Sequence, residues 1–455
     1  MTKQTTRFVC QECGAVLPKW AGQCDVCKGW NCVVEEVIRQ VQPKQPNAEV
    51  SDDFFYSLDA NEALGQLQTS QRHKTQIAEL NRVLGGGFVS GSVVLLGGAP
   101  GIGKSTLLLQ ILSHIDDIEN FVYISAEESV RQVMLRASRL NLTNANLRIA
   151  AASDIHQILG AISNLNHGSV AVIDSIQTVS SELIQAPPGS ISQVRFCTQE
   201  LVNFAKKNDV IVIIVGHITK DGTIAGPKTL EHMVDCVLYF EGDNSHDYRI
   251  LRGEKNRYGP TDEIGIFSMT GKGLEEVSNP SAAFLSDHSG SVNGVAVFSG
   301  IEGTRPILSE VQALVTNTTI AVPRRSSVGF DFNRLAMLVA VLSNRCKLHF
   351  SNKDVFLNIA GGLKITEPAA DLAVVAAIMS ATLHKPLPKG SVFFGEVGLS
   401  GEVRSSRLTF VRVREAQKLG FSKIFCSHKT EDFEKTEGLE VMQLKAIPEI
   451  LGMLR

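Results

Sequence analysis

The sequence lacks a long hydrophobic segment. Its longest strongly apolar run, Val210–Val215, has the length of a strand, whereas a membrane-spanning helix needs roughly 18 or more apolar residues. The first ten residues, MTKQTTRFVC, also lack the apolar core of a secretory signal. We therefore expect no membrane span and no export, and a cytoplasmic protein.

The sequence also lacks a strong net charge and a disulfide-like cysteine pattern. Lys and Arg number 44 against 47 Asp and Glu, a net charge of −3, which excludes a nucleic-acid binder that relies on bulk positive charge. Any DNA contact must come from local patches. The 9 cysteines are odd in number, and those beyond residue 32 are scattered singly, a pattern typical of a reducing compartment.

Composition and hydrophobic patterning divide the 455 residues into four segments. Residues 1–32 are rich in Cys, Gly and Trp, and residues 33–60 carry the prolines and polar residues of a linker. Residues 61–272 alternate Val/Ile/Leu-rich runs with helix-length stretches, which predicts a parallel sheet with crossover helices. Residues 273–455 predict a second α/β domain, with one strand at Thr319–Pro323. The predicted fold class is α/β.

Four cysteines of the first segment have the spacing of a zinc ribbon. Cys10, Cys13, Cys24 and Cys27 form the pattern C-x2-C-x10-C-x2-C. Each pair places two thiolates on one turn, and two such turns complete a tetrahedron around Zn²⁺. A module this small cannot bury a sufficient core, so the metal would supply its folding energy. Two redox pairs or disulfides are the alternatives, and Cys32 is either a free thiol or a competing ligand.

A phosphate-binding loop follows the first strand of the third segment. GAPGIGKS satisfies G-x4-G-K-[ST] between the strand VVLLGG and the helix TLLLQIL, which is the setting that the motif requires. Lys104 would reach the β- and γ-phosphates of ATP, and the Ser105 hydroxyl would bind Mg²⁺. The residues expected to contact the nucleotide are Gly98, Ala99, Pro100, Gly101, Ile102, Gly103, Lys104, Ser105 and Thr106.

Hydrolysis requires further groups at the ends of neighbouring strands. Asp174 ends the strand VAVID and is the candidate for the Mg²⁺-associated carboxylate. Glu127 and Glu128 follow the strand NFVYIS, and we expect one to orient water and the other to act as a charge in a helix's first turn. His217 ends the strand VIVIIVGH and is either a γ-phosphate sensor or a structural residue.

Several longer segments resemble one family. The chain is similar to the bacterial RadA (Sms) family of DNA repair proteins in five segments: LNRVLGGGFVSGSVVLLGGAPGIGKSTLLLQ, AEES, VIDSIQT, GHITKDGTIAGPKTLEHMVD and KNRYG. The resemblance extends over essentially the whole chain. It implies a RecA-like ATPase that forms hexameric rings on single-stranded and branched DNA and drives branch migration, with a RecA-type recombinase filament as a partner. The KNRYG segment has Tyr258 where the family has Phe.

The resemblance also implies roles for individual residues. Glu127 would activate water, Asp174 would act with Mg²⁺, and His217 would sense the γ-phosphate. Lys255 and Arg257 would project into the nucleotide of a neighbouring subunit and complete its site, as an arginine finger does. The alternative is that these two cations pair locally with acids such as Glu254 or Asp262.

Candidate DNA contacts come from short basic segments. A proline-interrupted stretch after the Asp174 strand resembles a mobile DNA-contacting loop, a second candidate loop follows His217, and adjacent arginines in the last segment suit phosphate binding. A solvated or salt-bridged face is the alternative. The candidates are Arg195, Lys220, Lys228, Arg324 and Arg325.

The last segment resembles the proteolytic domain of Lon without its catalytic residues. Ala369, in the run EPAAD, stands where Lon has its nucleophilic serine, and no lysine occurs between Lys389 and Lys418, where the base would lie. A methyl group cannot attack a carbonyl. We expect an inactive scaffold for oligomerisation and DNA binding. An ATP-dependent protease and a nucleotide-switched scaffold of the KaiC kind are the alternatives to a DNA motor.

Overall fold

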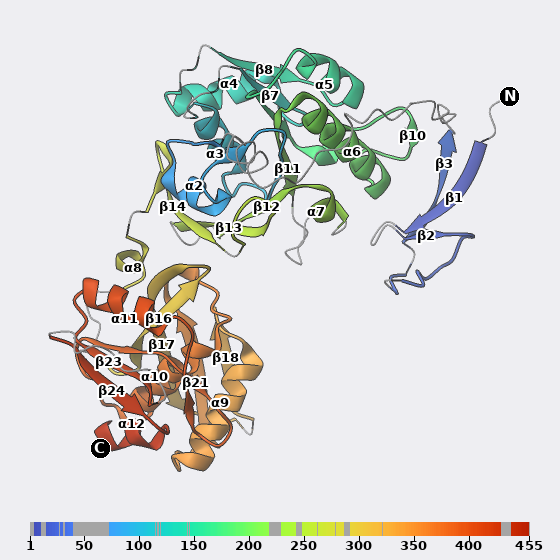
Figure 1. Cartoon of the computed structure of the whole chain (residues 1–455). Helices are drawn as coiled ribbons and strands as arrows, with labels where there is room; N and C mark the ends of the chain where they lie inside the picture. Colours follow the sequence, from blue (N-terminus) through green and yellow to red (C-terminus); the bar gives the residue numbers. More distant parts are fainter. Residues whose placement is uncertain are drawn as a thin grey trace, which may run out of the picture. The chain divides into compact units, whose positions relative to one another are not determined.

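The computed structural model of the chain describes residues 4–10, 15–26, 28–30, 32–39, 72–113, 115, 118, 120–142, 144, 146–217, 229–242, 248–261, 263–277, 279–285, 292–320, 322–428 and 438–454. The chain forms two compact units, Met1–Glu276 and Val277–Arg455, which are described separately (Figure 1). Among the described helices, none has the length and apolar character needed to cross a membrane.

Cys10 ends the first strand of a small antiparallel sheet. Strand β1 (Gln4–Cys10) pairs with β2 (Val16–Leu17) on one side and with β3 (Val33–Arg39) on the other. The short strand β10 (Ile184–Gln185) pairs in turn with β3. Residues 33–39, which we expected in the linker, therefore belong to the ribbon sheet, because their backbone pairs with β1 along its whole length.

The main sheet of the nucleotide-binding region has nine described strands, in the order β15-β14-β13-β12-β6-β11-β9-β7-β8. They are β6 (Val93–Gly98), β7 (Phe121–Ser125), β8 (Leu147–Ala151), β9 (Val170–Asp174), β11 (Ile211–His217), β12 (Cys236–Glu241), β13 (Tyr248–Asn256), β14 (Ile264–Thr270) and β15 (Gly273–Glu276). Strands β12 to β8 in this order are parallel, and β13, β14 and β15 are antiparallel additions. The parallel part confirms the predicted α/β sheet.

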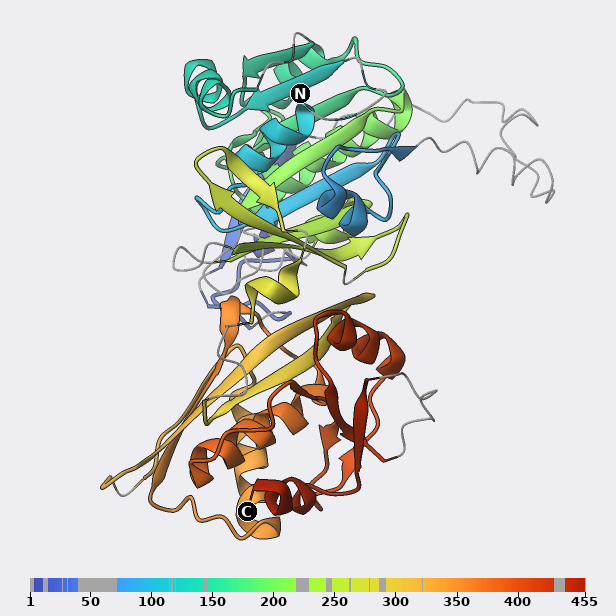
Figure 2. The ribbon, with the colours of Figure 1, turned by 90° about the vertical axis from the view of Figure 1, so that its left-hand side faces the viewer.

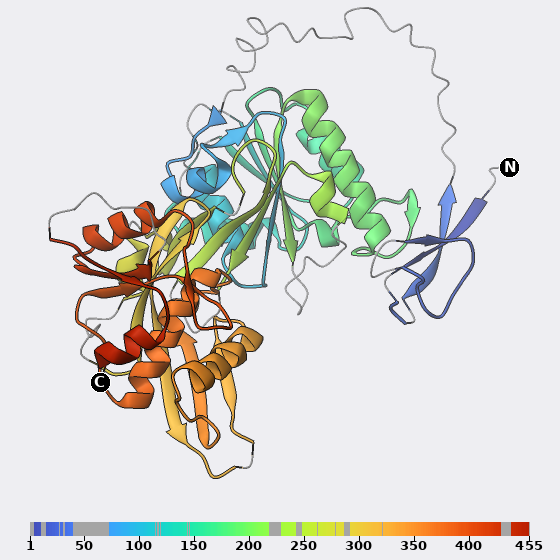
Figure 3. The same cartoon turned by 60° about the horizontal axis from the view of Figure 1, so that its bottom comes forward.

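Helices cover both faces of this sheet (Figures 2 and 3). They are α2 (Ala78–Leu84), α3 (Lys104–Leu112), α4 (Val130–Arg139), α5 (Ile155–Ile162), α6 (Ile191–Asn208) and α7 (Thr229–Met233), with a 3₁₀ turn η2 (Ile176–Thr178). The short strands β4 (Arg72–His73) and β5 (Phe88–Val89), between which α2 lies in the sequence, pair as a separate two-stranded antiparallel sheet.

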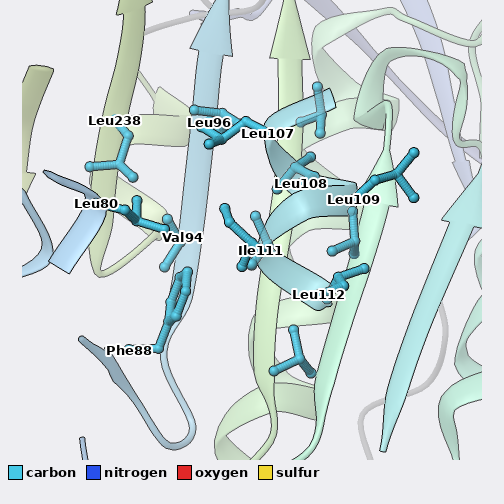
Figure 4. Close-up of a cluster of buried hydrophobic side chains, with 14 of the residues drawn as sticks. Leu80, Phe88, Val94, Leu96, Leu107, Leu108, Leu109, Ile111, Leu112 and Leu238 are labelled. Carbon is cyan, nitrogen blue, oxygen red and sulfur yellow. The ribbon is translucent and has the colours of Figure 1, made fainter. Parts of the chain in front are cut away.

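The two faces explain the continuous apolar runs of the parallel strands. Val94 and Leu96 of β6 pack into one core cluster with α2 and α3 (Figure 4). Val93 and Leu95 of the same strand pack into the cluster on the opposite face, with α5 and α6. Because successive side chains of a strand point to opposite faces, a strand buried on both sides needs apolar residues throughout.

The nucleotide-binding region extends slightly beyond the boundary expected after residue 272. Strand β15 pairs with β14 through Gly273 and Thr270. The side-chain amide of Gln110, on α3, bonds both to the Leu274 carbonyl and to the Leu274 amide, each at 3.0 Å. Leu274 thereby belongs to the core of the first unit, which ends at Glu276.

The second unit contains a seven-stranded sheet of described strands in the order β18-β19-β17-β16-β20-β23-β24, and a hairpin of β21 and β22. Its strands are β16 (Val295–Glu302), β17 (Arg305–Asn317), β18 (Arg325–Val328), β19 (Lys353–Ile359), β20 (Ser391–Phe393), β21 (Glu396–Val397), β22 (Val403–Arg404), β23 (Lys423–Ser427) and β24 (Glu440–Leu444). Its helices are α8 (Pro280–Ala283), α9 (Phe332–Arg345), α10 (Asp371–Leu383), α11 (Thr409–Lys418) and α12 (Pro448–Leu454), with 3₁₀ turns η3 (Ala360–Gly362) and η4 (Pro368–Ala370).

The strand predicted at Thr319–Pro323 is wrong for the described residues of that range, and the next strand begins only at Arg325. The Ile320 amide bonds to the hydroxyl of Thr318, a local bond that favours a turn over a ladder. Ile320 and Val322 are 50% and 77% exposed, so burial of their side chains does not stabilise an extended strand here. Helix α10, by contrast, is buried from Asp371 to Ala381, which accounts for its apolar sequence.

Candidate functional site

The phosphate-binding loop lies between β6 and α3 and depends on its glycines. Gly101 and Gly103 have φ of 76° and 118°, which other residues adopt only with strain. A Cβ on Gly103 would lie 2.7 Å from the Met269 side chain, and one on Gly98 would lie 2.8 Å from the Phe240 carbonyl. Helix α3 starts without a side-chain cap, so its first amides remain available to an anion.

Lys104 lies buried at the start of α3 and contacts the loop that precedes it. Its ammonium donates to the carbonyls of Gly98 and Ala99 at 2.8 and 3.0 Å. It also lies 3.3 Å from Nδ1 of His217, at the end of β11. Burial lowers the pKa of Lys104, while the charges of Asp174 and Glu127 oppose that shift. The cation is therefore desolvated and held by carbonyls of the loop and by His217.

Ser105 and Asp174 lie in direct contact. The Ser105 hydroxyl donates to Oδ2 of Asp174 at 2.7 Å, and the Tyr123 hydroxyl donates to the same oxygen at 2.5 Å. Tyr123 belongs to β7 and is 1% exposed. Its burial, followed by the Asp174 charge, raises the pKa of this phenol. One carboxylate is thus oriented by two hydroxyls, a set of oxygens suited to a hard cation such as Mg²⁺.

Glu127 and Glu128 have different surroundings. Oε1 of Glu127 accepts from the Ser175 hydroxyl and lies 3.1 Å from Nε2 of His217. Glu128 instead forms an ion pair with Arg136 on α4, at 2.7 Å. Within the described part of the chain, Glu127 is thus the one of the two carboxylates that contacts His217.

His217 joins Lys104 to Glu127. A protonated lysine can only donate, so Nδ1 of His217 accepts from Lys104 and the hydrogen of the neutral ring lies on Nε2, which donates to Glu127. These residues come together because β6, β11, β9 and β7 are neighbouring parallel strands. Their carboxyl ends meet at one edge of the sheet, where ligands of open α/β sheets bind.

Lys255 contacts backbone carbonyls in this chain. Its ammonium donates to the carbonyls of Glu231 and Val234 at 2.6 and 2.8 Å, and to that of His232 at 3.3 Å. These carbonyls lie at the end of α7, where a cation is favoured. Burial and the Arg257 charge lower the pKa of Lys255.

Arg257 pairs with Asp235, an acid that the sequence did not single out. The two side chains lie 3.2 Å apart, and Asp235 also accepts from the Val93 amide at 3.0 Å, at the start of β6. Of the partners expected for local pairing, Asp262 lies outside the described residues. The two cations of the KNRYG segment thus both have partners within the described part of this chain.

Sequence reasoning missed Tyr123, Ser175 and Asp235. Ser175 lies in the VIDSIQT segment, so the resemblance contained a signal for it. Asp235 ends the segment GHITKDGTIAGPKTLEHMVD, which belongs to the same resemblance. Tyr123 carries no such signal, because one tyrosine in an apolar strand is common in a protein core.

Comparison with known proteins identifies the family. A family of AAA domains matches residues 60–223, one of rubredoxin metal-binding domains matches residues 8–35, and one described as subunit ChlI of Mg-chelatase matches residues 311–430. The chain is 49% identical to DNA repair protein RadA of Rickettsia felis, over 99% of this chain and 100% of that protein. It is 47% identical to the protein of the same name from Bacillus subtilis, over 99% of each. The chain belongs to the RadA family.

A solved structure of the RadB recombinase also matches, with 22% identity, a TM-score of 0.36, and coverage of 45% of this chain and 99% of that one. The RadA relationship, in contrast, extends over both units. The expected order of zinc ribbon, RecA-like ATPase core and Lon-like domain is thereby confirmed.

The ribbon of this RadA family member contains two described zinc-ligand candidates. Cys10 and Cys24 are fully buried and belong to one small cluster with Leu17 and Val33. Two buried thiols in a cluster with so little apolar surface fit a metal-held module. Cys13 and Cys27, the other expected ligands, lie outside the described residues.

The candidate DNA contacts differ in availability. Arg195 on α6 and Arg324 are exposed. Arg325 donates to the carbonyls of Lys353 and Phe350 at 2.6 and 3.0 Å, so its guanidinium is engaged within the second unit. Lys220 and Lys228 lie outside the described residues.

The segment expected as a mobile DNA loop is held by Gln193. Its side-chain amide donates to the carbonyls of Ser181, Ile184 and Ala186 at 2.8 to 3.0 Å, and accepts from the Ser181 amide at 2.9 Å. Gln193 is 2% exposed. This part of the segment is therefore a fixed turn ahead of α6.

The Lon-like domain of the RadA chain retains a cavity at Ala369. It has a volume of about 430 Å³, and Glu367, Arg412 and Ser406 line it as well. Arg412 is fully buried and pairs with Glu367. Among the described residues that line the cavity, none is a lysine. The cavity therefore retains space beside Ala369, but its described lining has neither the nucleophilic serine nor the lysine of Lon at these positions.

Proposed function

We propose that this chain is a DNA-stimulated ATPase that assembles as a hexameric ring on single-stranded and branched DNA and drives branch migration during recombinational repair. The contact chain Lys104–His217–Glu127 at the phosphate-binding loop is the observation that supports turnover of ATP. Membership of a family named for DNA repair supports the biological setting.

ATP would bind with its phosphates against the first amides of α3 and the ammonium of Lys104. Ser105 and Asp174, already in contact at 2.7 Å, would hold Mg²⁺, which when bound neutralises negative charge on the phosphate oxygens. The Tyr123 hydroxyl would keep Asp174 in the orientation that this requires.

Glu127 would orient the attacking water, since its carboxylate lies on the same network as Lys104. When Lys104 turns toward a γ-phosphate, His217 loses its donor and is free to reorient relative to Glu127. This sequence of contacts supports a role for His217 as γ-phosphate sensor. Glu128, paired with Arg136, would position α4.

Lys255 and Arg257 would complete the site of a neighbouring subunit. In the single chain, Lys255 contacts the carbonyls that end α7, and Arg257, whose side chain is 49% exposed, pairs with Asp235. Assembly would exchange these local partners for the phosphates of the adjoining nucleotide. A purely local structural role is the alternative, and a monomeric form with full activity would favour it.

DNA would be bound by local basic groups, of which Arg195 and Arg324 are exposed. A RecA-type recombinase filament is the expected protein partner. Proteolysis is disfavoured, because Ala369 provides no nucleophile and no lysine occurs among the described lining residues of its cavity.

The test is ATP hydrolysis with and without single-stranded DNA, measured beside branch migration of a synthetic junction. We expect DNA to stimulate the native chain, and expect Lys104→Ala and Glu127→Gln to abolish both activities. Glu127→Gln should still bind ATP, because its carboxylate acts on water. Glu128→Gln is the matched control and should keep most activity. Equal turnover with and without DNA, together with no strand movement, would instead favour the nucleotide-switched scaffold.

A further inference from the structure

A fifth cysteine lies beside the expected zinc ligands. Cys32 falls outside both C-x2-C pairs, yet its sulfur lies 3.4 Å from the sulfur of Cys10 and 3.2 Å from the carbonyl oxygen of Gly29. Cys10 is fully buried and Cys32 is 7% exposed. The proximity follows from the sheet, because Cys10 pairs with Val33 in the register of β1 and β3, which places Cys32 directly beside the paired position.

We propose that Cys10 and Cys32 form a peroxide-sensitive disulfide that removes Cys10 from the zinc site. The proposal rests on the zinc-binding part of the proposed function and adds a modification site to it. The two sulfurs already lie 3.4 Å apart, and a disulfide brings its sulfurs to about 2.05 Å from each other. Closing the bond therefore requires a shift of side chains within the ribbon sheet, without a rearrangement of its strands.

The chemistry is balanced with a hydroperoxide as the two-electron oxidant. The Cys10 thiolate attacks one peroxide oxygen and the O–O bond breaks. Hydroxide departs, and Cys10 becomes a sulfenic acid. The Cys32 sulfur then attacks the Cys10 sulfur and the S–O bond breaks. The thiol proton of Cys32 joins the departing hydroxyl as water. The two sulfurs lose two electrons, and the peroxide gains them.

The consequence for the ribbon follows from its ligand count. With Cys10 in a disulfide, three of the four expected thiolates remain, and the site no longer offers four sulfur ligands. Because metal binding supplies the folding energy of so small a module, the ribbon would lose order together with its zinc. A thiol reductant would restore the Cys10 ligand, so the change is reversible.

Cysteines in the nucleotide-binding region are poor competitors for the oxidant. Burial raises the pKa of the Cys197 thiol and of the Cys236 thiol to about 12. Since the thiolate is the reactive form, these two sites remain reduced under conditions that oxidise the ribbon. Cys346 is also buried, in the second unit, and provides a control position.

The experiment exposes the zinc-loaded full-length chain to hydrogen peroxide. Zinc release is followed with a chromogenic chelator, and disulfides are mapped by mass spectrometry after digestion. The native chain should release zinc, yield a Cys10–Cys32 cross-linked peptide, and rebind zinc after reduction. Cys32→Ser should bind the same amount of zinc before oxidation and yield no Cys10–Cys32 peptide, and it should release less zinc than the native chain, because no sulfur outside the four-cysteine set remains to hold Cys10 away from the metal. Cys346→Ser should behave as the native chain does.

Two results would overturn the proposal. One is a native chain whose mapped disulfide omits Cys32, and the other is a Cys32→Ser chain that releases and recovers zinc as the native chain does. DNA-stimulated ATP hydrolysis, measured before peroxide is added, tests the proposed function separately. A chain that hydrolyses ATP but forms no Cys10–Cys32 bond would therefore refute the peroxide-sensitive disulfide and leave the proposed function standing.

Discussion

The ion pair between Glu367 and Arg412 should be a main determinant of the stability of the second unit. Arg412 is 0% exposed and the Glu367 side chain is 25% exposed. The guanidinium also donates to the carbonyls of Ser299 and Arg407, at 2.5 and 3.0 Å. Glu367→Gln keeps the shape of the side chain and removes its charge, which leaves the Arg412 charge buried.

The magnitude follows from the burial. Removing one partner of a buried ion pair costs about 3–5 kcal/mol, and water at the partly exposed Glu367 screens some of that, so we expect about 3 kcal/mol. For a unit of this size each kcal/mol lowers the melting temperature by roughly 2–4 °C, which predicts a decrease of about 6–12 °C. Replacing both residues, by Glu367→Leu with Arg412→Met, should recover most of the loss because no unpaired charge remains.

The assay is thermal unfolding of the full-length chain, with hydrogen exchange by mass spectrometry to assign the change to the second unit. Peptides from α11 and η4 should exchange faster in Glu367→Gln, and peptides from α3 should be unaffected. Glu402→Gln, which removes a partner of the exposed Arg404, is the control and should leave the transition unchanged. An unchanged transition in Glu367→Gln, or a double variant less stable than the single one, would refute the reasoning.

Three further predictions concern the first unit and DNA. Tyr123→Phe removes a hydroxyl that donates to Asp174. Because a hydrogen bond to a charged group contributes about 1.5 kcal/mol or more, the Mg²⁺ concentration for half-maximal ATP hydrolysis should rise about tenfold. An unchanged Mg²⁺ titration would contradict this role of Tyr123. Gln193→Ala removes four hydrogen bonds from the turn before α6, so amide exchange should accelerate there and not in β9. Arg324→Ala should weaken DNA binding similarly for all sequences and reduce the salt slope by about one, in a titration at several salt concentrations.

The sequence by itself determined the features that depend on consecutive residues. The phosphate-binding loop is one, because its glycines, Lys104 and Ser105 act within a single strand–turn–helix. The parallel sheet is another, since a strand buried on both faces must be apolar throughout. The boundaries were less exact, as β3 and β15 show, because a pairing partner and not local composition decides where a strand ends.

Only the tertiary structure decided which side chains work together. Glu127 and Glu128 are adjacent and chemically identical, and they differ only because the fold places His217 beside the first and Arg136 beside the second. Arg324 and Arg325 are likewise adjacent and chemically identical, but only the guanidinium of Arg325 is described as donating to the carbonyls of Lys353 and Phe350. Such contacts join residues that lie far apart along the chain, so their energies depend on packing distances that no local pattern contains.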